Sequence, residues 1–136
     1  MRLGRSAAVL TQLREASAKA LARRITQHIR DLAMPNGVLQ IKCGQLDKFM
    51  PLGRDELKFI FSANMGEPLN DLEKVASGGE LSRIALAVKT VLMNSGDVAT
   101  MVFDEIDTGV GGVTAQKMAD LLLTRVEKPI WLSLNQ

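Results

Sequence analysis

Several features that would place a protein outside the cell interior are missing from this sequence of 136 residues. Cys43 is its single cysteine, so no internal disulfide can form, and a reducing setting fits. The first apolar stretch, at residues 7–10, is too short for a secretory signal peptide. No apolar run approaches the roughly 18 residues that a membrane-spanning helix needs. The sequence therefore predicts a cytoplasmic protein without a membrane partner.

The sequence also lacks a block of lysines and arginines. Its 17 basic and 15 acidic residues give a formal net charge of +2 and a pI of about 8.9. This near balance does not indicate a DNA-coating arm, so contacts with DNA must come from a few placed residues or from parts outside this chain. Four basic residues near an expected strand pair are candidates, although a solvated surface is the ordinary explanation for such residues. They are Lys42, Lys48, Arg54 and Lys58.

What is present begins with a long amphipathic helix, expected from about residue 6 to residue 33. Apolar residues at three- and four-residue steps predict one buried stripe. Such a helix packs on its own domain or forms the returning end of a coiled-coil arm. About three heptads of an alanine-rich seam do not decide between the two. The expected stripe consists of Leu10, Leu13, Leu21, Ile25, Ile29 and Leu32, with Ser17 filling the gap.

Two strands are expected next, after a turn that contains proline and glycine. Residues 38–43 form the first strand and residues 56–61 the second. In the second strand Leu57, Phe59 and Phe61 share one face. The two strands are expected to pair as an antiparallel ribbon.

The second half of the sequence alternates helices and strands. This order predicts an α/β layer with parallel strands, so α/β is the expected fold class. A helix at 79–93 is followed by a buried strand at 99–103, a helix at 113–126 and a strand at 129–132. The residues of the first of these helices expected to face inward are Leu81, Ile84, Ala85, Val88, Val91 and Leu92.

The first candidate site, residues 77–83, lies at the start of the helix expected at 79–93. Ser77 and Glu80 have the spacing of a capping box, which serves any helix start. The box does not explain Gly78 and Gly79, which lower helix stability but let backbone N–H groups approach an anion closely. The motif therefore indicates either a plain cap or a contact with phosphate.

The second candidate site ends the strand expected at 99–103. Asp104 and Glu105 follow its apolar run, and ligands bind at the carboxyl ends of strands in open α/β sheets. Asp104 is suited to hold Mg²⁺ beside ATP phosphates, and Glu105 to orient or deprotonate the attacking water. Solvated acids at the end of a strand are the alternative explanation.

Together the two sites have the order and spacing of the second half of an ABC-type ATPase. Residues 66–69, 74–83 and 103–110 resemble the RecN family of bacterial DNA-repair proteins, and residues 31–35 are also similar. The sequence Asp-Glu-Ile-Asp-Thr-Gly-Val, within the third of these segments, is the most specific part. The resemblance covers nearly the whole chain.

The resemblance implies the C-terminal lobe of an ABC/SMC-type P-loop ATPase head. Residues 1–34 would be the end of a coiled-coil arm, and residues 35–136 an incomplete lobe. The implied partners are the N-terminal lobe of the same head, a second head in a homodimer, and DNA. ATP turnover would serve recombinational repair of DNA double-strand breaks at the bacterial nucleoid.

The resemblance also implies a role for each site residue. Residues 77–80 would act in trans on the γ-phosphate of ATP held by the partner head. Asp104 would hold Mg²⁺, and Glu105 would be the catalytic base that converts ATP and water to ADP and phosphate. An aspartate that contacts the partner head aligns with Gly111, where Asp107 is a nearby substitute.

Two further departures from the family pattern affect the expected activity. The sequence has no G-x-x-x-x-G-K-[ST] loop, which the family carries in the other lobe, so this chain alone is expected to lack ATPase activity. The family has a histidine after the last expected strand that senses the γ-phosphate. Here none follows, so the chain either stops short of it or has lost it, and His28 lies in the first helix.

Three alternatives stay open. One is another SMC-like ATPase or a transporter ATPase. The transporter is disfavoured because the sequence before residue 77 lacks a helical insert and a glutamine loop. Another is a non-catalytic module of the same fold for head dimerisation, which the missing histidine favours. The last is an unrelated α/β binding domain in which Ser77 and Glu80 only cap a helix.

Overall fold

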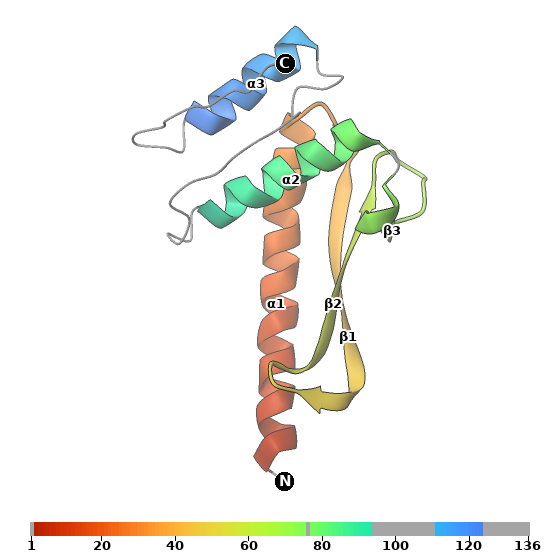
Figure 1. The fold of residues 1–136 in the computed structure, drawn as a ribbon, viewed down its shortest axis with the longest axis vertical. Helices are drawn as coiled ribbons and strands as arrows, with labels where there is room; N and C mark the ends of the chain where they lie inside the picture. Colours follow the sequence, from red (N-terminus) through yellow and green to blue (C-terminus); the bar gives the residue numbers. More distant parts are fainter. Residues whose placement is uncertain (1, 76, 94–110, 124–136) are drawn as a thin grey trace.

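The computed structural model describes residues 2–75, 77–93 and 111–123. A long helix, α1, runs beside a β-hairpin, while α2 crosses α1 near its C-terminal end and α3 lies beyond α2 (Figure 1). None of the described helices combines the length and apolar character needed to cross a membrane. The elements are α1 (Arg2–Asp31), β1 (Val38–Met50), β2 (Gly53–Ser62), β3 (Asn70–Asp71), a 3-10 helix η1 (Leu72–Lys74), α2 (Gly78–Met93) and α3 (Gly112–Leu123).

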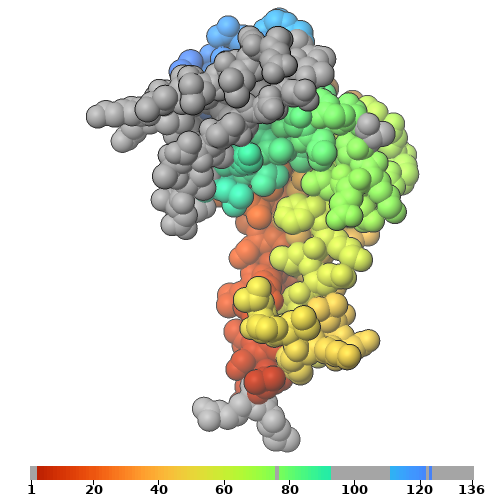
Figure 2. Space-filling view, viewed as in Figure 1, coloured from red at the N-terminus to blue at the C-terminus, as the bar shows by residue number. Residues whose placement is uncertain are grey.

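The described strands form one antiparallel sheet in the order β1-β2-β3. This mixture of helices and a small sheet agrees with the α/β class at a coarse level. The parallel strands expected at 99–103 and 129–132 fall outside the described residues. In space-filling view α1 and the hairpin form a narrow stalk below a wider end that contains α2 (Figure 2).

The predicted ribbon of β1 and β2 is confirmed. The strands pair in register from Val38 opposite Ser62 to Gln45 opposite Asp55. Both strands are longer than predicted, because the pairing continues to the hairpin turn. Gly53 closes this turn with a φ of 105°, a conformation that strongly favours glycine.

The burial of β2 differs from the predicted alternation near its end. Ile60 and Phe61 are each only 3% exposed, although they point to opposite faces. Phe61 is part of the core that the helices form. Ile60 pairs with Asp71 of β3. Leu57, which shares a face with Phe59 and Phe61, is 46% exposed because it lies nearer the hairpin tip.

The buried stripe of α1 is only partly as predicted. Ile25, Ile29 and Leu32 are completely buried, but Leu13 is 62% exposed and Ser17 is also exposed. The stripe instead continues toward the N-terminus through small residues, which let the hairpin approach the helix closely. These residues are Ala7, Thr11, Ala18 and Ala22.

The prediction for α2 was wrong at three of its six inward positions. Leu81 and Leu92 are 44% and 45% exposed, and Ala85 is exposed. Three positions that the prediction omitted are buried instead, namely Leu86, Ala87 and Thr90. Ile84 and Leu86 lie about 200° apart around the helix, so α2 is covered on more than one side.

One core joins these elements above the stalk. It contains the C-terminal half of α1, the paired ends of β1 and β2, most of the buried face of α2, and Met118 of α3. Gly37, which leads from α1 into β1, is required by this packing, because a Cβ there would lie 2.7 Å from the Ile29 side chain. The core thus fixes the position of α2, whose N-terminus carries the first candidate site.

Candidate functional site

The capping interaction predicted at the start of α2 is present. The Ser77 hydroxyl oxygen accepts a hydrogen bond from the Glu80 N–H at 3.4 Å. The Ser77 carbonyl accepts one from the Leu81 N–H at 3.0 Å. Among the described residues Glu80 makes no return bond to Ser77, so only half of the capping box forms.

Gly78, the next residue, has no such structural explanation in the described structure. Gly78 does not adopt a left-handed conformation, and a Cβ built on it meets no atom within 4 Å. In the described parts of the chain, the N–H groups of Gly78 and Gly79 have no hydrogen-bond acceptor. Ser77 and Gly78 are exposed. At the positive end of the α2 dipole, the described structure therefore leaves these two amides for a ligand that carries negative charge.

Arg83 is a further candidate that the sequence analysis gave no role. It lies one turn into α2, on the same side as Glu80. Its Nε atom is buried and finds no hydrogen-bond partner in the described structure. A buried donor without an acceptor is unfavourable, so a group that accepts from Arg83 would stabilise this end of the helix.

The second candidate site is not covered by the structure. Asp104, Glu105 and Asp107 lie outside the described residues, and their roles stay predictions. Within the described residues no group of three His, Cys, Asp or Glu side chains is arranged to hold a metal ion. Gly111 is described and exposed, and its carbonyl caps α3 by accepting from the N–H groups of Thr114 and Ala115 at 2.9 and 3.0 Å.

Comparison with known proteins supports the family resemblance. The chain is 40% identical over 118 residues to the DNA repair protein RecN of Haemophilus influenzae, and 41% identical over 119 residues to that of Treponema pallidum. It is 39% identical over 129 residues to RecN of Bacillus subtilis. These matches cover 86%, 83% and 84% of the chain. The chain is of the RecN type.

The RecN-type chain spans about a fifth of the length of these relatives, since the matches cover 21%, 21% and 22% of them. No family model matches the chain.

A polar anchor holds the hairpin of the RecN-type chain against α1. The Asp55 side chain is 1% exposed, and the Arg14 Nη1 atom lies 2.7 Å from its carboxylate. The Thr11 hydroxyl donates to the same carboxylate at 2.6 Å. The pKa of Asp55 is lowered from its usual 3.8, first by the hydrogen bond from Thr11 and then by that from Arg14. This anchor was not predicted, because the partners are more than 40 residues apart.

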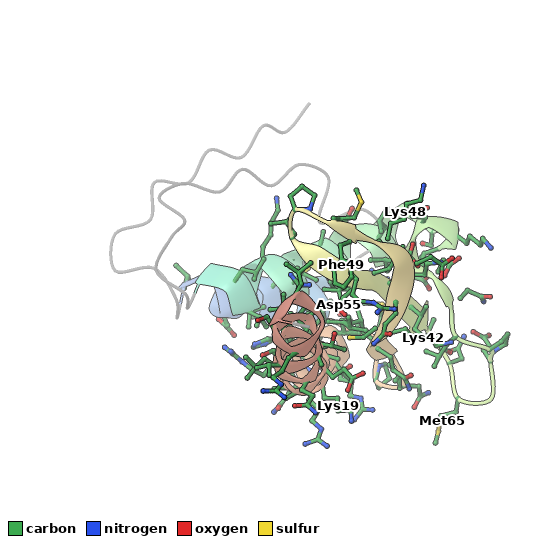
Figure 3. The ribbon with its side chains drawn as sticks, turned by 90° about the horizontal axis from the view of Figure 1, so that it is seen from below. Lys19, Lys42, Lys48, Phe49, Asp55 and Met65 are labelled. Atoms are coloured by element: carbon green, nitrogen blue, oxygen red, sulfur yellow. The ribbon has the colours of Figure 1, made fainter. Side chains whose placement is uncertain are left out.

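The four basic residues proposed from the sequence for DNA contact do not act as one group. Lys58 lies 3.5 Å from Glu56, and the Arg54 guanidinium carbon lies 5.7 Å from the centroid of the Phe49 ring. Lys42 and Lys48 are exposed on the hairpin (Figure 3). A role of the four residues in DNA contact stays a prediction.

Proposed function

We propose that this RecN-type chain supplies one half of a composite ATP site in a DNA-repair ATPase. The observation that carries the proposal is the exposed start of α2, where neither packing nor backbone conformation in the described structure requires Gly78. Free amides at a helix N-terminus suit a phosphate group. The relatives named DNA repair protein RecN support placing that phosphate in a repair enzyme.

In this proposal, residues 77–79 bind the γ-phosphate of ATP held by a second head. Ser77 caps the helix by accepting from the Glu80 N–H, which leaves the N–H groups of Gly78 and Gly79 for the phosphate. The glycines let a phosphate oxygen approach the backbone without a side chain between them. Arg83 supplies a nearby cation whose Nε donor is otherwise unused in the described structure.

The acidic residues complete the chemistry on the chain's own head. Asp104 would hold Mg²⁺, and Glu105 would take the proton of the water that attacks the γ-phosphate. Bound Mg²⁺ would neutralise charge on the phosphates. Asp107, or the residue position of Gly111, would contact the partner head across the same interface.

In the whole protein, ATP binding would join two heads and hydrolysis would release them. A lobe that carries the phosphate loop would complete each head, and α1 would continue into a coiled-coil arm. The proposed task of this cycle is to hold DNA during repair of double-strand breaks, in the bacterial cytoplasm at the nucleoid.

Survival of the source bacterium after double-strand breakage tests this function. Replacement of the gene by its Glu105→Gln or Asp104→Ala variant is expected to lower survival to that of a deletion strain. Gly4→Ala, an exposed substitution in α1, is the control and is expected to leave survival unchanged. Full survival of the two acidic variants would contradict the ATPase proposal and support the non-catalytic dimerisation module.

The isolated chain is expected to hydrolyse no ATP, because it lacks the loop that supplies most phosphate contacts. A coupled phosphate-release assay on the purified chain measures this directly. Steady hydrolysis that disappears in the Glu105→Gln variant would show that the chain holds a complete site.

A further inference from the structure

Positive charge is concentrated on α1. The helix contains seven lysines and arginines but only two acidic residues, Glu15 and Asp31. The whole chain has a formal net charge of only +2, so the remaining residues together are net negative. The net charge of the whole chain does not show that the positive charge lies on α1.

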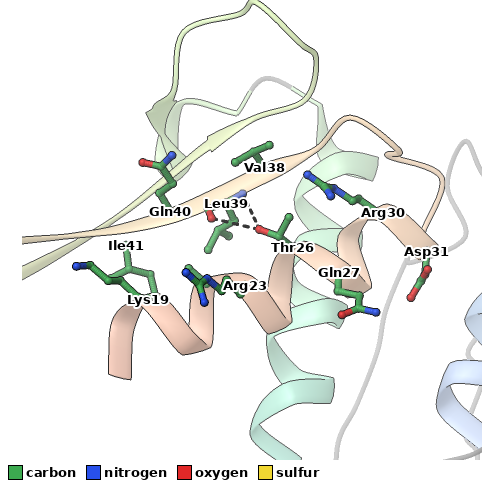
Figure 4. Close-up of a pocket in the computed structure, with 11 residues that line it drawn as sticks. Lys19, Arg23, Thr26, Gln27, Arg30, Asp31, Val38, Leu39, Gln40 and Ile41 are labelled. Carbon is green, nitrogen blue, oxygen red and sulfur yellow. Dashed lines mark hydrogen bonds between the residues drawn. The ribbon is translucent and has the colours of Figure 1, made fainter. Parts of the chain in front are cut away.

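Part of this charge lines a groove between α1 and β1, here called the basic groove. Its volume is about 740 Å³. Lys19, Arg23 and Arg30 form the α1 wall, and Gln40 and Ile41 belong to the β1 wall (Figure 4). The three cations follow one face of the helix, spaced by about 6 Å and then about 10 Å along its axis.

The three cations are not neutralised by the rest of the described structure. None of the ion pairs among the described residues involves them. Among the described residues that line the groove, Asp31 is the one acidic residue. Like charges that neighbour one another on a helix repel, so an anionic ligand along this row of cations would stabilise it.

The remaining hydrogen-bonding groups of the basic groove are partly used within the fold and partly left for a polar ligand. Thr26 accepts from the Leu39 N–H at 3.1 Å and donates to the Leu39 carbonyl at 3.2 Å, which satisfies the edge of β1. The Arg30 Nε donates to the Gly37 carbonyl at 3.3 Å and leaves the terminal nitrogens of its guanidinium for other partners. The side chains of Gln27 and Gln40 add further hydrogen-bonding groups.

We propose that the basic groove binds the phosphate backbone of duplex DNA. The choice of DNA among anionic ligands rests on the proposed function, while the site itself rests on the groove and its cations. A row about 16 Å long follows several phosphates of one strand, whose axial spacing is about 3.4 Å. Cations that contact phosphates fix position without reading sequence, so binding is independent of DNA sequence.

The test measures fluorescence anisotropy of a labelled duplex of about 30 base pairs, titrated with the 136-residue chain in about 50 to 200 mM salt. The Lys19→Gln/Arg23→Gln variant leaves the Arg30 bond to Gly37 intact, so it preserves the turn after α1. The matched control, Arg24→Gln/Lys117→Gln, removes the same charge from exposed positions outside the groove. Circular dichroism and thermal unfolding verify that both variants fold.

The groove variant is expected to bind about tenfold or more weakly at 0.1 M salt. Its slope of log K against log salt is expected to fall in magnitude by about two, because two phosphate contacts are lost. The magnitude of this slope is expected to be larger for the control than for the groove variant by at least one. A purely structural role of Lys19 and Arg23 would not produce this salt dependence.

Three outcomes would overturn the groove as a DNA site. Equal slopes for the groove variant and the control would place the DNA contact elsewhere and leave the repair function standing. Absence of DNA binding by the unaltered chain would reject the groove, while bacterial survival would still decide the repair function separately. The groove variant can also be made in the full-length gene product. If it then loses thermal stability but keeps its DNA binding, another part of the protein occupies the groove.

Discussion

Ala33 adopts a left-handed backbone conformation, with φ at 62°, in the turn that ends α1. Helices often end on glycine in this conformation, which costs other residues about 1–2 kcal/mol. Alanine at this position therefore stores strain, and glycine would remove it.

Ala33→Gly is expected to raise the free energy of unfolding by about 0.5 kcal/mol, since part of the relieved strain is offset by the greater freedom of glycine in the unfolded chain. The matched control is Ala20→Gly, at an exposed position inside α1, which is expected to lower it by about 1 kcal/mol. Urea unfolding measures both. Destabilisation of equal size by the two substitutions would rule out strain at Ala33.

Asp55 makes the stability of the stalk depend on pH. Its pKa is lowered in the folded chain, so its ionised form contributes stability above pH 3.8, and this contribution is lost as pH falls through the folded pKa. Asp55→Asn is expected to be less stable than the unaltered chain at neutral pH, and the difference should shrink below pH 3.8. Arg14→Gln should keep part of the pH dependence, because the Thr11 hydrogen bond is the larger cause. Thermal unfolding across this pH range provides the measurement, and a difference independent of pH would refute the assignment.

At the scale of elements, the sequence predicted α1 and the β1–β2 ribbon from local patterns. Periodicity alone identified them because each shows its own repeat over many residues. Periodicity did not identify the buried face of each helix. The stripe of α1 passes through Ala7 and Thr11, whose burial depends on the hairpin packed against them, and hydrophobicity does not mark such positions.

The same limit explains the error in α2. A one-sided stripe was expected, but a helix covered on several sides buries residues around its circumference. Leu86 is 0% exposed and Leu81 is 44% exposed, although the sequence analysis placed Leu81 inside.

These two leucines give a direct test of how α2 packs. Leu86→Ala is expected to lower the free energy of unfolding by about 2–5 kcal/mol, because it leaves a cavity in the core. Leu81→Ala is expected to lower it by only about 0.5 kcal/mol, since its side chain is largely solvated. Chemical denaturation of the two variants compares them, and a larger loss for Leu81→Ala would restore the predicted orientation of α2.

At the scale of the whole molecule, the sequence predicted the helix cap at Ser77, and the phosphate contact beside it stays a prediction. Ser77 and the glycines were identified because their pattern combines a cap with residues that a cap does not need. No role was predicted for Arg83, and the basic groove was not predicted. An unpaired Nε and a row of unpaired cations, as the described residues show them, are properties of packing rather than of spacing.

The central claim is that the start of α2 faces phosphate rather than solvent. One substitution, Gly78→Asp, separates an effect on folding stability from an effect on phosphate binding. Aspartate in the first turn of a helix favours folding, but its carboxylate would repel a phosphate at the same amides. Gly4→Asp is the matched control, because Gly4 is also an exposed helical glycine and a Cβ there also meets no atom within 4 Å.

The decisive measurement is self-association of the full-length gene product with an ATP analogue that resists hydrolysis, followed by sedimentation. We expect both variants to melt at or above the temperature of the unaltered protein. Gly4→Asp should associate normally, and Gly78→Asp should stay unassociated with the analogue present. Normal nucleotide-dependent association of Gly78→Asp would contradict the account and leave Ser77 as no more than a helix cap.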